Sequence, residues 1–173
     1  SNDAYTAGGK AGFRPDYAAT VYTQILKRLY PHVPVVVGGI EASLRRLTHY
    51  DYWSDSLRPS MIVESGADLL IYGMGERVVQ QVARAMRNGY NAKLLRKINQ
   101  VAFVADRSYV ERLDPDTTIR LHSFEECQRN KRAFVPAGNV DDIIVGRIGN
   151  DVVQRSDNGF KIVLRNAFDA HLR

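Results

Sequence analysis

Residues 41–53 gather side chains whose types could bind a charged or flat ligand. Arginine guanidinium groups hold phosphate or carboxylate through paired hydrogen bonds, and aromatic rings stack on flat groups. The alternative is structural: the charges pair with one another, and the aromatic rings pack against a neighbouring domain. We favour this structural interpretation, because loops of this composition are often buried against another domain. The candidate residues are Glu41, Arg45, Arg46, His49, Asp51, Tyr52 and Trp53.

Two glycine turns form a second candidate site. Gly38 and Gly39 close one apolar run, and Gly73 and Gly75 follow another. In open parallel sheets, ligands bind outside the carboxyl ends of the strands. Glycine lets the backbone approach a ligand closely, and a helix that begins at Glu76 favours an anion. The alternative is that these glycines only permit tight turns. The second turn is not a dinucleotide fingerprint, because a valine stands where the third glycine is required.

Neither a metal site nor a catalytic residue is predicted. The four histidines have no metal-ligand spacing with one another or with Cys127, the one cysteine of the chain. A single cysteine excludes an internal disulfide and is typical of a reducing, cytoplasmic setting. We interpret Cys127 as a buried structural residue within a helix rather than as a catalytic thiol.

Length and composition are those of an ordinary globular protein. Of the 173 residues, 45% are apolar and 25% are charged, which suits one domain with a core and a small appendage. No apolar run is long enough to predict a membrane span, and no signal peptide is visible. The net charge of +5 allows a nucleic-acid partner. The basic residues are spread along the chain, however, and this favours an ordinary basic surface.

The apolar pattern predicts helices that alternate with buried strands. A first helix begins at Pro15 and ends before Pro31, with one apolar stripe and an opposite polar face. The stripe consists of Ala18, Val21, Tyr22, Ile25, Leu26 and Leu29, and the polar face carries Thr23, Gln24, Lys27 and Arg28. Further strands are predicted over 33–37, 68–72, 101–105 and 118–121, and further helices over 41–47, 76–87, 92–98 and 123–134.

Two local signals complete the expected fold. Ser123 and Glu126 have the spacing of a capping box, and Asp157-Asn158-Gly159 predicts a β-hairpin between residues 151–155 and 160–165. Residues 48–59 are expected to form a loop. We therefore predict an α/β fold with a parallel, doubly wound, Rossmann-like sheet. Its expected parts are a flexible lead-in at 1–14, the α/β domain at 15–122, and a helix with a hairpin appendage at 123–173.

Several segments together resemble the YgiQ-type family of radical S-adenosylmethionine (SAM) proteins. The likeness covers nearly the whole chain and is most specific between Gly38 and Trp53. The most specific segments are Val35-Val36-Val37-Gly38-Gly39-Ile40-Glu41-Ala42-Ser43-Leu44-Arg45-Arg46 and His49-Tyr50-Asp51-Tyr52-Trp53. Residues 3–6, 8–12, 14–16, 66–70, 72–76 and 123–126 also match.

The resemblance implies an accessory domain with a cobalamin-binding-like sheet, incomplete in this chain, that precedes a radical SAM core. That core would hold a four-iron, four-sulfur cluster through three thiolates and bind SAM at the fourth iron. This chain has one cysteine, so the cluster and SAM are expected in the rest of the parent protein. The expected partners are the core of the same polypeptide and its substrate, with no membrane. The alternative is a module that binds a nucleotide or a corrinoid.

Overall fold

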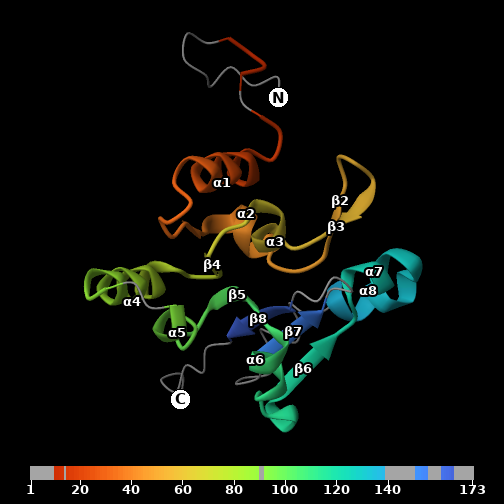
Figure 1. Cartoon of the computed structure of the whole chain (residues 1–173). Coiled ribbons are helices and arrows are strands. Elements are labelled where there is room, and N and C mark those ends of the chain that lie inside the picture. The colour runs from red at the N-terminus through yellow and green to blue at the C-terminus, as the bar shows by residue number, and fades with distance from the viewer. Residues whose placement is uncertain (1–9, 14, 90–91, 139–150, 156–160, 166–173) are drawn as a thin grey trace.

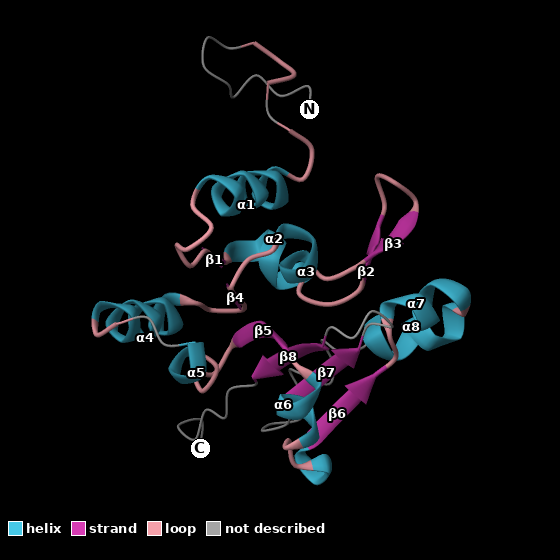
Figure 2. Ribbon diagram, viewed as in Figure 1, coloured by secondary structure: helices cyan, strands magenta, loops and turns pink. Residues whose placement is uncertain are grey.

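The computed structural model describes residues 10–13, 15–89, 92–138, 151–155 and 161–165. They form one six-stranded sheet with helices on both faces, and a separate two-stranded hairpin (Figure 1, Figure 2). The strand order across the sheet is β1-β4-β5-β8-β7-β6. The predicted α/β class is therefore confirmed. No helix of the described residues is both long enough and apolar enough to cross a membrane.

The sheet combines parallel and antiparallel neighbours. β1 runs parallel to β4, and β6 runs parallel to β7, whereas the pairs β4–β5, β5–β8 and β7–β8 are antiparallel. The parallel pairing that the alternation of helices and strands predicts is realised between β1 and β4, whereas the next strand of that alternation, β5, runs antiparallel to β4. The strands are β1 Val36–Val37, β4 Leu69–Ile71, β5 Val101–Ala105, β6 Thr118–Leu121, β7 Asp151–Arg155 and β8 Lys161–Arg165.

Successive residues of each strand point to opposite faces of the sheet, and each face has its own apolar cluster. On one face, Met61 and Ile62 pack with Leu70 and Ala102. This face carries α1 Ala18–Leu29, α2 Gly39–Leu44 and α3 Met61–Ser65. On the other face, Val82 packs with Leu69 and Phe103 among others. That face carries α4 Glu76–Arg87, α5 Ala92–Leu95 and α6 Arg107–Glu111.

Elements with a strong local signal are found where the sequence predicts them. α4 buries Val78 and Val82 and ends before Gly89, which has a φ of +102°. The capping box of α7 is present, with the Ser123 hydroxyl and the Glu126 carboxylate each accepting from the other's backbone N–H. The helix predicted over 123–134 is divided at Asn130, whose backbone is extended, into α7 Phe124–Arg129 and α8 Lys131–Gly138. Cys127 is fully buried in α7, as predicted.

The predicted C-terminal hairpin is confirmed, and it lies inside the sheet rather than beside it. Its strands β7 and β8 pair antiparallel with each other and are flanked by β6 and β5. The apolar residues Val152, Val153, Val163 and Leu164 are completely buried, which explains the inner position. The predicted turn at 157–159 lies outside the described residues.

The expected loop at 48–59 contains a second hairpin. β2 His49–Asp51 pairs antiparallel with β3 Ser56–Arg58, and Asp55 turns the chain with a φ of +47°. Two short helices, α3 and α6, and the 3-10 turn η2 Pro115–Thr117 are also additions to the sequence prediction. Elements of three to five residues carry too few side chains for an apolar period to be recognised.

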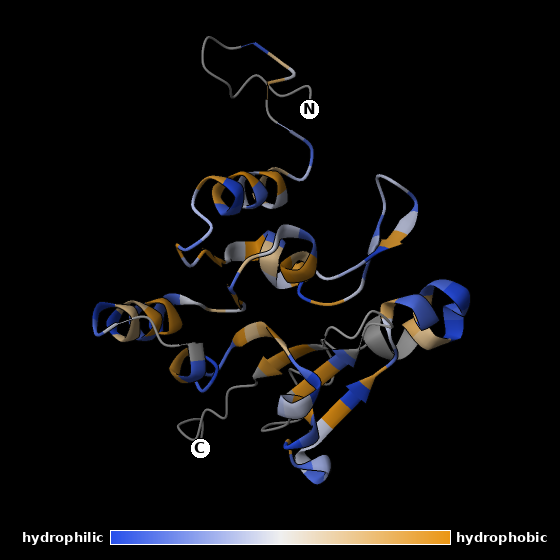
Figure 3. Ribbon diagram, viewed as in Figure 1, coloured by the Kyte–Doolittle hydropathy of each residue, from blue (hydrophilic) through white to orange (hydrophobic). Residues whose placement is uncertain are grey.

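The orientation of α1 differs from the one that its apolar stripe indicates. Its buried residues are Thr20 and Thr23, on the polar face. The exposed residues include four large apolar side chains of the stripe, Tyr22, Ile25, Leu26 and Leu29. In Figure 3, α1 carries both orange, hydrophobic bands and blue, hydrophilic ones. The apolar stripe of α1 is therefore not covered by the described part of the chain.

Polar contacts explain this orientation of α1. The Lys27 Nζ lies 2.9 Å from the Asp68 Oδ2, and the Gln24 side chain donates to the Glu64 backbone carbonyl at 2.8 Å. Both contacts join residues about 40 positions apart, so no local sequence pattern predicts them. The polar face of the helix is held against α3 and the start of β4.

Gln154 supplies a polar link inside the sheet, and its loss is expected to destabilise the fold. Its side chain accepts from the Thr48 N–H at 2.8 Å and donates to the His122 carbonyl at 3.1 Å. Leucine fills a similar volume but leaves both backbone groups without that partner. Each unsatisfied buried group costs about 1–3 kcal/mol, so with two such groups Gln154→Leu should lower the free energy of unfolding by roughly 2–6 kcal/mol. Chemical denaturation followed by circular dichroism measures this change. Gln81→Leu, at an exposed position of α4, is the matched control; equal effects of the two substitutions would contradict the prediction.

Candidate functional site

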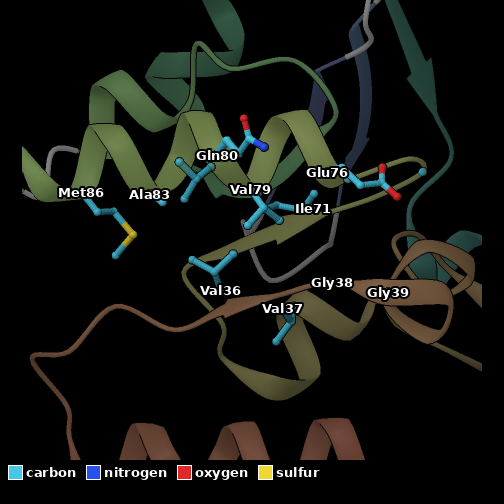
Figure 4. Close-up of a pocket in the computed structure, with 13 residues that line it drawn as sticks. Val36, Val37, Gly38, Gly39, Ile71, Glu76, Val79, Gln80, Ala83 and Met86 are labelled. Atoms are coloured by element: carbon cyan, nitrogen blue, oxygen red, sulfur yellow. The ribbon is translucent and has the colours of Figure 1, made fainter.

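A hollow of about 760 Å³ opens between β1 and α4. Figure 4 shows Val36 and Val37 on the β1 side of this β1–α4 hollow and Val79, Ala83 and Met86 on α4. The glycines of both predicted turns, Gly38, Gly39, Gly73 and Gly75, line it together with Glu76. The parallel pairing of β1 with β4 therefore brings the two turns together at the carboxyl ends of adjacent strands, as the sequence predicts.

The backbone at two of these glycines has a conformation that disfavours other residues. Gly39 has a φ of +90° and Gly73 a φ of +70°, values that side chains with a Cβ rarely adopt. Ser43 joins the two turns, because its hydroxyl donates to the Gly39 carbonyl at 2.8 Å and accepts from the Gly73 N–H at 3.1 Å. The two turns are thus held together by a side chain of α2.

A different constraint requires glycine at position 75, which directly precedes α4. A Cβ at this position would lie 3.1 Å from the Ile71 Cγ2, so the glycine lets the start of α4 pack against the end of β4. The walls of the hollow are mainly aliphatic, with Glu76 and Gln80 as polar side chains. Such a lining can hold an apolar or flat body.

The second group of candidate residues surrounds the buried carboxylate of Asp51, at the end of β2. Its Oδ2 accepts from the Tyr17 hydroxyl at 2.6 Å, from the Ser54 hydroxyl at 2.5 Å and from the Ser54 N–H at 3.0 Å. The Arg45 guanidinium lies 3.8 Å from the other oxygen and also pairs with Glu41 at 3.0 Å. The charges of this segment therefore pair with one another, as the structural interpretation predicts.

The contacts of Asp51 determine its ionisation. Burial by itself would raise the pKa of this carboxyl group. The hydrogen bonds from Ser54 and Tyr17, with the positive charge of Arg45, outweigh the burial and lower the pKa to about 2. Asp51 is therefore a stable carboxylate at neutral pH, and its negative charge anchors the β2–β3 hairpin to α1 and α2.

Tyr17 lies at the centre of this cluster although the sequence analysis did not single it out. The guanidinium carbons of Arg58 and Arg45 lie 4.1 Å and 5.1 Å from the centre of its ring, which is the range of cation–π contacts. Arg58 also pairs with the Glu64 carboxylate. Tyr17, Ser54 and Arg58 are the site residues that sequence reasoning missed. Tyr17 stands 34 positions before Asp51, and no spacing rule connects them.

Arg46 is buried and His49 is half-buried, and both contact backbone carbonyls. Arg46 is buried, donates to the Ser43 carbonyl and lies 5.3 Å from the centre of the Tyr72 ring. The His49 Nδ1 is 3.1 Å from the Leu47 carbonyl oxygen. Burial lowers the pKa of His49, with the nearby Arg45 charge adding to the effect. The histidine is therefore neutral at pH 7 and carries no charge that would attract an anion.

The aromatic pair Tyr52 and Trp53 forms the exposed tip of the β2–β3 hairpin. Their ring centres lie 4.6 Å apart, and Trp53 is 76% exposed. Tyr50, also exposed, donates to the Asp55 carboxylate at 2.5 Å. The rings do not pack against the described part of this chain. The candidate residues thus separate into the glycine hollow, the Asp51 cluster and an exposed aromatic tip.

These features define an α/β domain with a hollow beside two glycine turns and an exposed aromatic tip. The family model described as "Radical SAM N-terminal" matches residues 1–170. This chain belongs to the radical SAM N-terminal family.

Curated relatives of this chain bear the name UPF0313 protein. The one from Porphyromonas gingivalis is 49% identical over 132 residues, which are 76% of this chain and 21% of the relative. Those from Bacteroides thetaiotaomicron and Thermotoga maritima are 46% and 44% identical, over 76% and 78% of this chain and 23% of each relative. The chain therefore spans about a fifth of the length of these relatives. No solved structure matches it.

The residues of this chain do not fit the iron–sulfur cluster that the family name implies. Such a cluster requires several cysteine thiolates, and the chain has one cysteine. That residue, Cys127, is completely buried in α7, and burial raises the pKa of its thiol. Among the described residues, no group of three or more histidine, cysteine or acidic side chains is arranged to hold a metal ion.

Acid is expected to weaken the β2–β3 hairpin through Asp51. The folded-state pKa of about 2 lies below the ordinary value of about 4. The ionised carboxylate therefore stabilises the fold above pH 4, and this contribution is lost as the pH falls towards 2. Asp51→Asn should lower the melting temperature at pH 7 and reduce its further decline between pH 5 and pH 3. The exposed Asp116→Asn serves as control, and an unchanged pH profile in Asp51→Asn would refute this role.

Proposed function

We propose that this chain is the accessory N-terminal domain of a radical SAM iron–sulfur enzyme and that it docks on the catalytic core of the same polypeptide. The observation that carries the proposal is the family match over residues 1–170. It is supported by the relatives, whose length is about five times the part matched here. With one cysteine in the chain, the cluster and the bound SAM belong to the rest of the polypeptide.

We assign the docking contact to the β2–β3 hairpin. Aromatic residues are enriched at the centres of interfaces, where they bury much area at small entropic cost. The Tyr52–Trp53 tip is exposed, yet its base is held by the buried Asp51 carboxylate. A contact surface on a fixed base loses less conformational entropy on binding than a free loop does. The hairpin would thereby help to shape one wall of the core's substrate pocket.

Replacing the aromatic tip tests this docking function. The double substitution Tyr52→Ala and Trp53→Ala is made in the full-length protein, which is reconstituted with iron and sulfide without oxygen. We expect the iron and sulfide content to stay unchanged, because the cluster ligands lie elsewhere. Reductive cleavage of SAM to 5′-deoxyadenosine should fall at least about tenfold, the effect of losing about 1.4 kcal/mol of docking free energy.

Leu94→Ala, at an exposed apolar position of α5, is the matched control for the aromatic tip. Equal rates of SAM cleavage in wild type and double variant would show that the hairpin does not dock. A full-length protein that holds no cluster at all would overturn the assignment to a radical SAM enzyme.

A second candidate function is small-molecule binding in the β1–α4 hollow. Its support is the volume of about 760 Å³, within the range of ligand pockets, at the carboxyl ends of two parallel strands, where α/β sheets bind ligands. The aliphatic walls and glycine turns suit a flat ligand such as a nucleotide base or a corrinoid.

A panel of adenine nucleotides and a corrinoid tests the hollow. Binding should raise the melting temperature of the full-length protein. At a ligand concentration 100 times Kd, binding adds about 2.7 kcal/mol to the free energy of unfolding. Ala83→Trp, which places an indole in the hollow, should abolish the shift, whereas Arg84→Trp on the exposed face of α4 should not. If no ligand of the panel raised the melting temperature of the wild-type protein, the hollow would not be a binding site for these ligands.

A further inference from the structure

The positive charge of this chain is concentrated in the segment from Arg77 to Ala105. This segment holds six of the 24 basic residues and none of the 19 acidic residues. The remainder, with 18 basic and 19 acidic residues, has a net charge close to zero. The net charge of +5 therefore comes from this one segment, which forms α4, α5 and β5. The basic residues are spread along the sequence, but the carboxylates that would balance them are not.

Three arginines of α4 share one side of the helix. Each residue advances about 100° around a helix, so Arg84 lies about 20° from Arg77 and Arg87 lies about 60° from Arg84. All three arginines are exposed, and they lie opposite Val78 and Val82, which α4 buries in the core. The surface of these three arginines is called the α4 basic face below.

The α4 basic face is not neutralised by the described part of the chain. Basic side chains elsewhere pair with carboxylates, as in Lys27 with Asp68, Arg58 with Glu64 and Arg107 with Glu111. Among the described residues, no carboxylate lies within ion-pair distance of the three arginines. Arg84 and Arg87 stand three positions apart, and like charges at this spacing destabilise a helix. A bound anion would relieve this repulsion.

The residues around the α4 basic face are mainly polar, and this indicates the class of partner. Gln80, Gln81 and Asn88 are exposed beside the arginines. Of the exposed large apolar residues in the described part of this segment, Val79 lines the hollow and Leu94 lies on α5. Protein–protein interfaces are built around apolar and aromatic anchors, whereas interfaces with nucleic acid are more polar and much more positively charged. The composition therefore favours a nucleic acid over an acidic protein.

The placement of α4 favours double-stranded RNA among the nucleic acids. Proteins that bind single strands stack the bases on aromatic rings, and the one aromatic residue in the described part of this segment, Phe103, is buried. One side of α4 is packed on the sheet through Val78 and Val82, so the helix presents a shallow surface and is not free to enter a deep groove. The minor groove of an RNA duplex is wide and shallow, with 2′-hydroxyl groups displayed in it. Guanidinium groups bind the flanking phosphates, and side-chain amides hydrogen-bond sugar and phosphate oxygens.

We propose that the α4 basic face binds the backbone of a double-stranded RNA segment, with Arg77, Arg84 and Arg87 on the phosphates and the neighbouring amides on the 2′-hydroxyl groups. α4 has 12 residues and is about 18 Å long, which is enough to span several phosphates of one strand. In Figure 1, α4 lies at the left of the domain and the β2–β3 hairpin at the right. RNA on α4 and a docked core on the hairpin would therefore not compete for the same surface.

Binding of a fluorescent RNA duplex of about 20 base pairs to the full-length protein tests the proposal. Fluorescence anisotropy gives Kd between about 50 and 200 mM salt. The triple substitution Arg77→Gln, Arg84→Gln and Arg87→Gln removes three phosphate contacts and keeps good helix formers. Kd at the lowest salt should rise at least about tenfold, and the slope of log K against log salt concentration should become shallower by about three.

The matched control removes the same charge from exposed arginines of α1, β6 and α8, through Arg28→Gln, Arg120→Gln and Arg132→Gln. This control should leave the salt slope almost unchanged, because its arginines lie on other elements. Equal slopes in the two triple variants would show that the α4 basic face is only solvated. A wild-type protein that binds no RNA at the lowest salt would overturn the proposal and leave an acidic protein as the partner to test.

Two further measurements locate the RNA and identify its class without relying on the variants. Photo-crosslinking of a duplex that contains 4-thiouridine, followed by mass spectrometry of the wild-type protein, should label peptides from residues 77–97. Cross-links confined to other parts of the polypeptide would place the RNA elsewhere and overturn the proposal. A DNA duplex of the same sequence lacks the 2′-hydroxyl groups and should bind at least about tenfold more weakly. Equal affinity for the two duplexes would overturn the assignment to RNA.

Discussion

The carboxylate of Asp68 joins the three elements on which the rest of this structure depends. It accepts from the Val35 N–H at 2.7 Å and from the Lys27 ammonium at 2.9 Å, while its own backbone N–H donates to the Val35 carbonyl at 2.9 Å. One residue thus sets β1 beside β4 and holds α1 above them. The two glycine turns meet because of this pairing, and the polar face of α1 is the buried face because of the same carboxylate.

The β2–β3 hairpin shows how a charged cluster can present an apolar surface. Asp51 is almost completely buried and receives hydrogen bonds from α1 and from its own turn. An unpaired carboxylate in that position would cost several kcal/mol, so its partners Tyr17, Ser54 and Arg45 must be in place whenever the hairpin is folded. The strands below the aromatic tip of Tyr52 and Trp53 are therefore held in one conformation by the contacts of Asp51. This suits a contact with a neighbouring domain better than it suits capture of a small anion.

Sequence reasoning located the candidate residues but grouped them differently from the structure. The glycines stand at the ends of apolar runs, so their meeting at the carboxyl ends of β1 and β4 follows from parallel pairing, which the alternation of helices and strands predicts. The segment 41–53 was treated as one site, whereas the structure divides it. Arg46 is buried, His49 is half-buried, Arg45 pairs with Glu41 and Asp51, and the two aromatic rings are exposed. Only the contacts of Tyr17, Ser54 and Arg58 reveal this division, and they join α1 and the hairpin through distant positions.

The sequence by itself determined the features that depend on neighbouring residues: the α4 period, the capping box at Ser123, the glycine turns, the buried Cys127 and the membership of a radical SAM N-terminal family. Tertiary structure alone decided which face of α1 is buried, where the C-terminal hairpin enters the sheet, and that β2 and β3 pair at all. The physical reason is the origin of the stabilising energy. Helices and their caps are stabilised by interactions between residues a few positions apart. The buried face of α1 and the β2–β3 hairpin depend on contacts between distant positions, Lys27 with Asp68 and Tyr17 with Asp51. The inner position of β7 and β8 depends on burying their apolar residues, which is possible only once the sheet has formed.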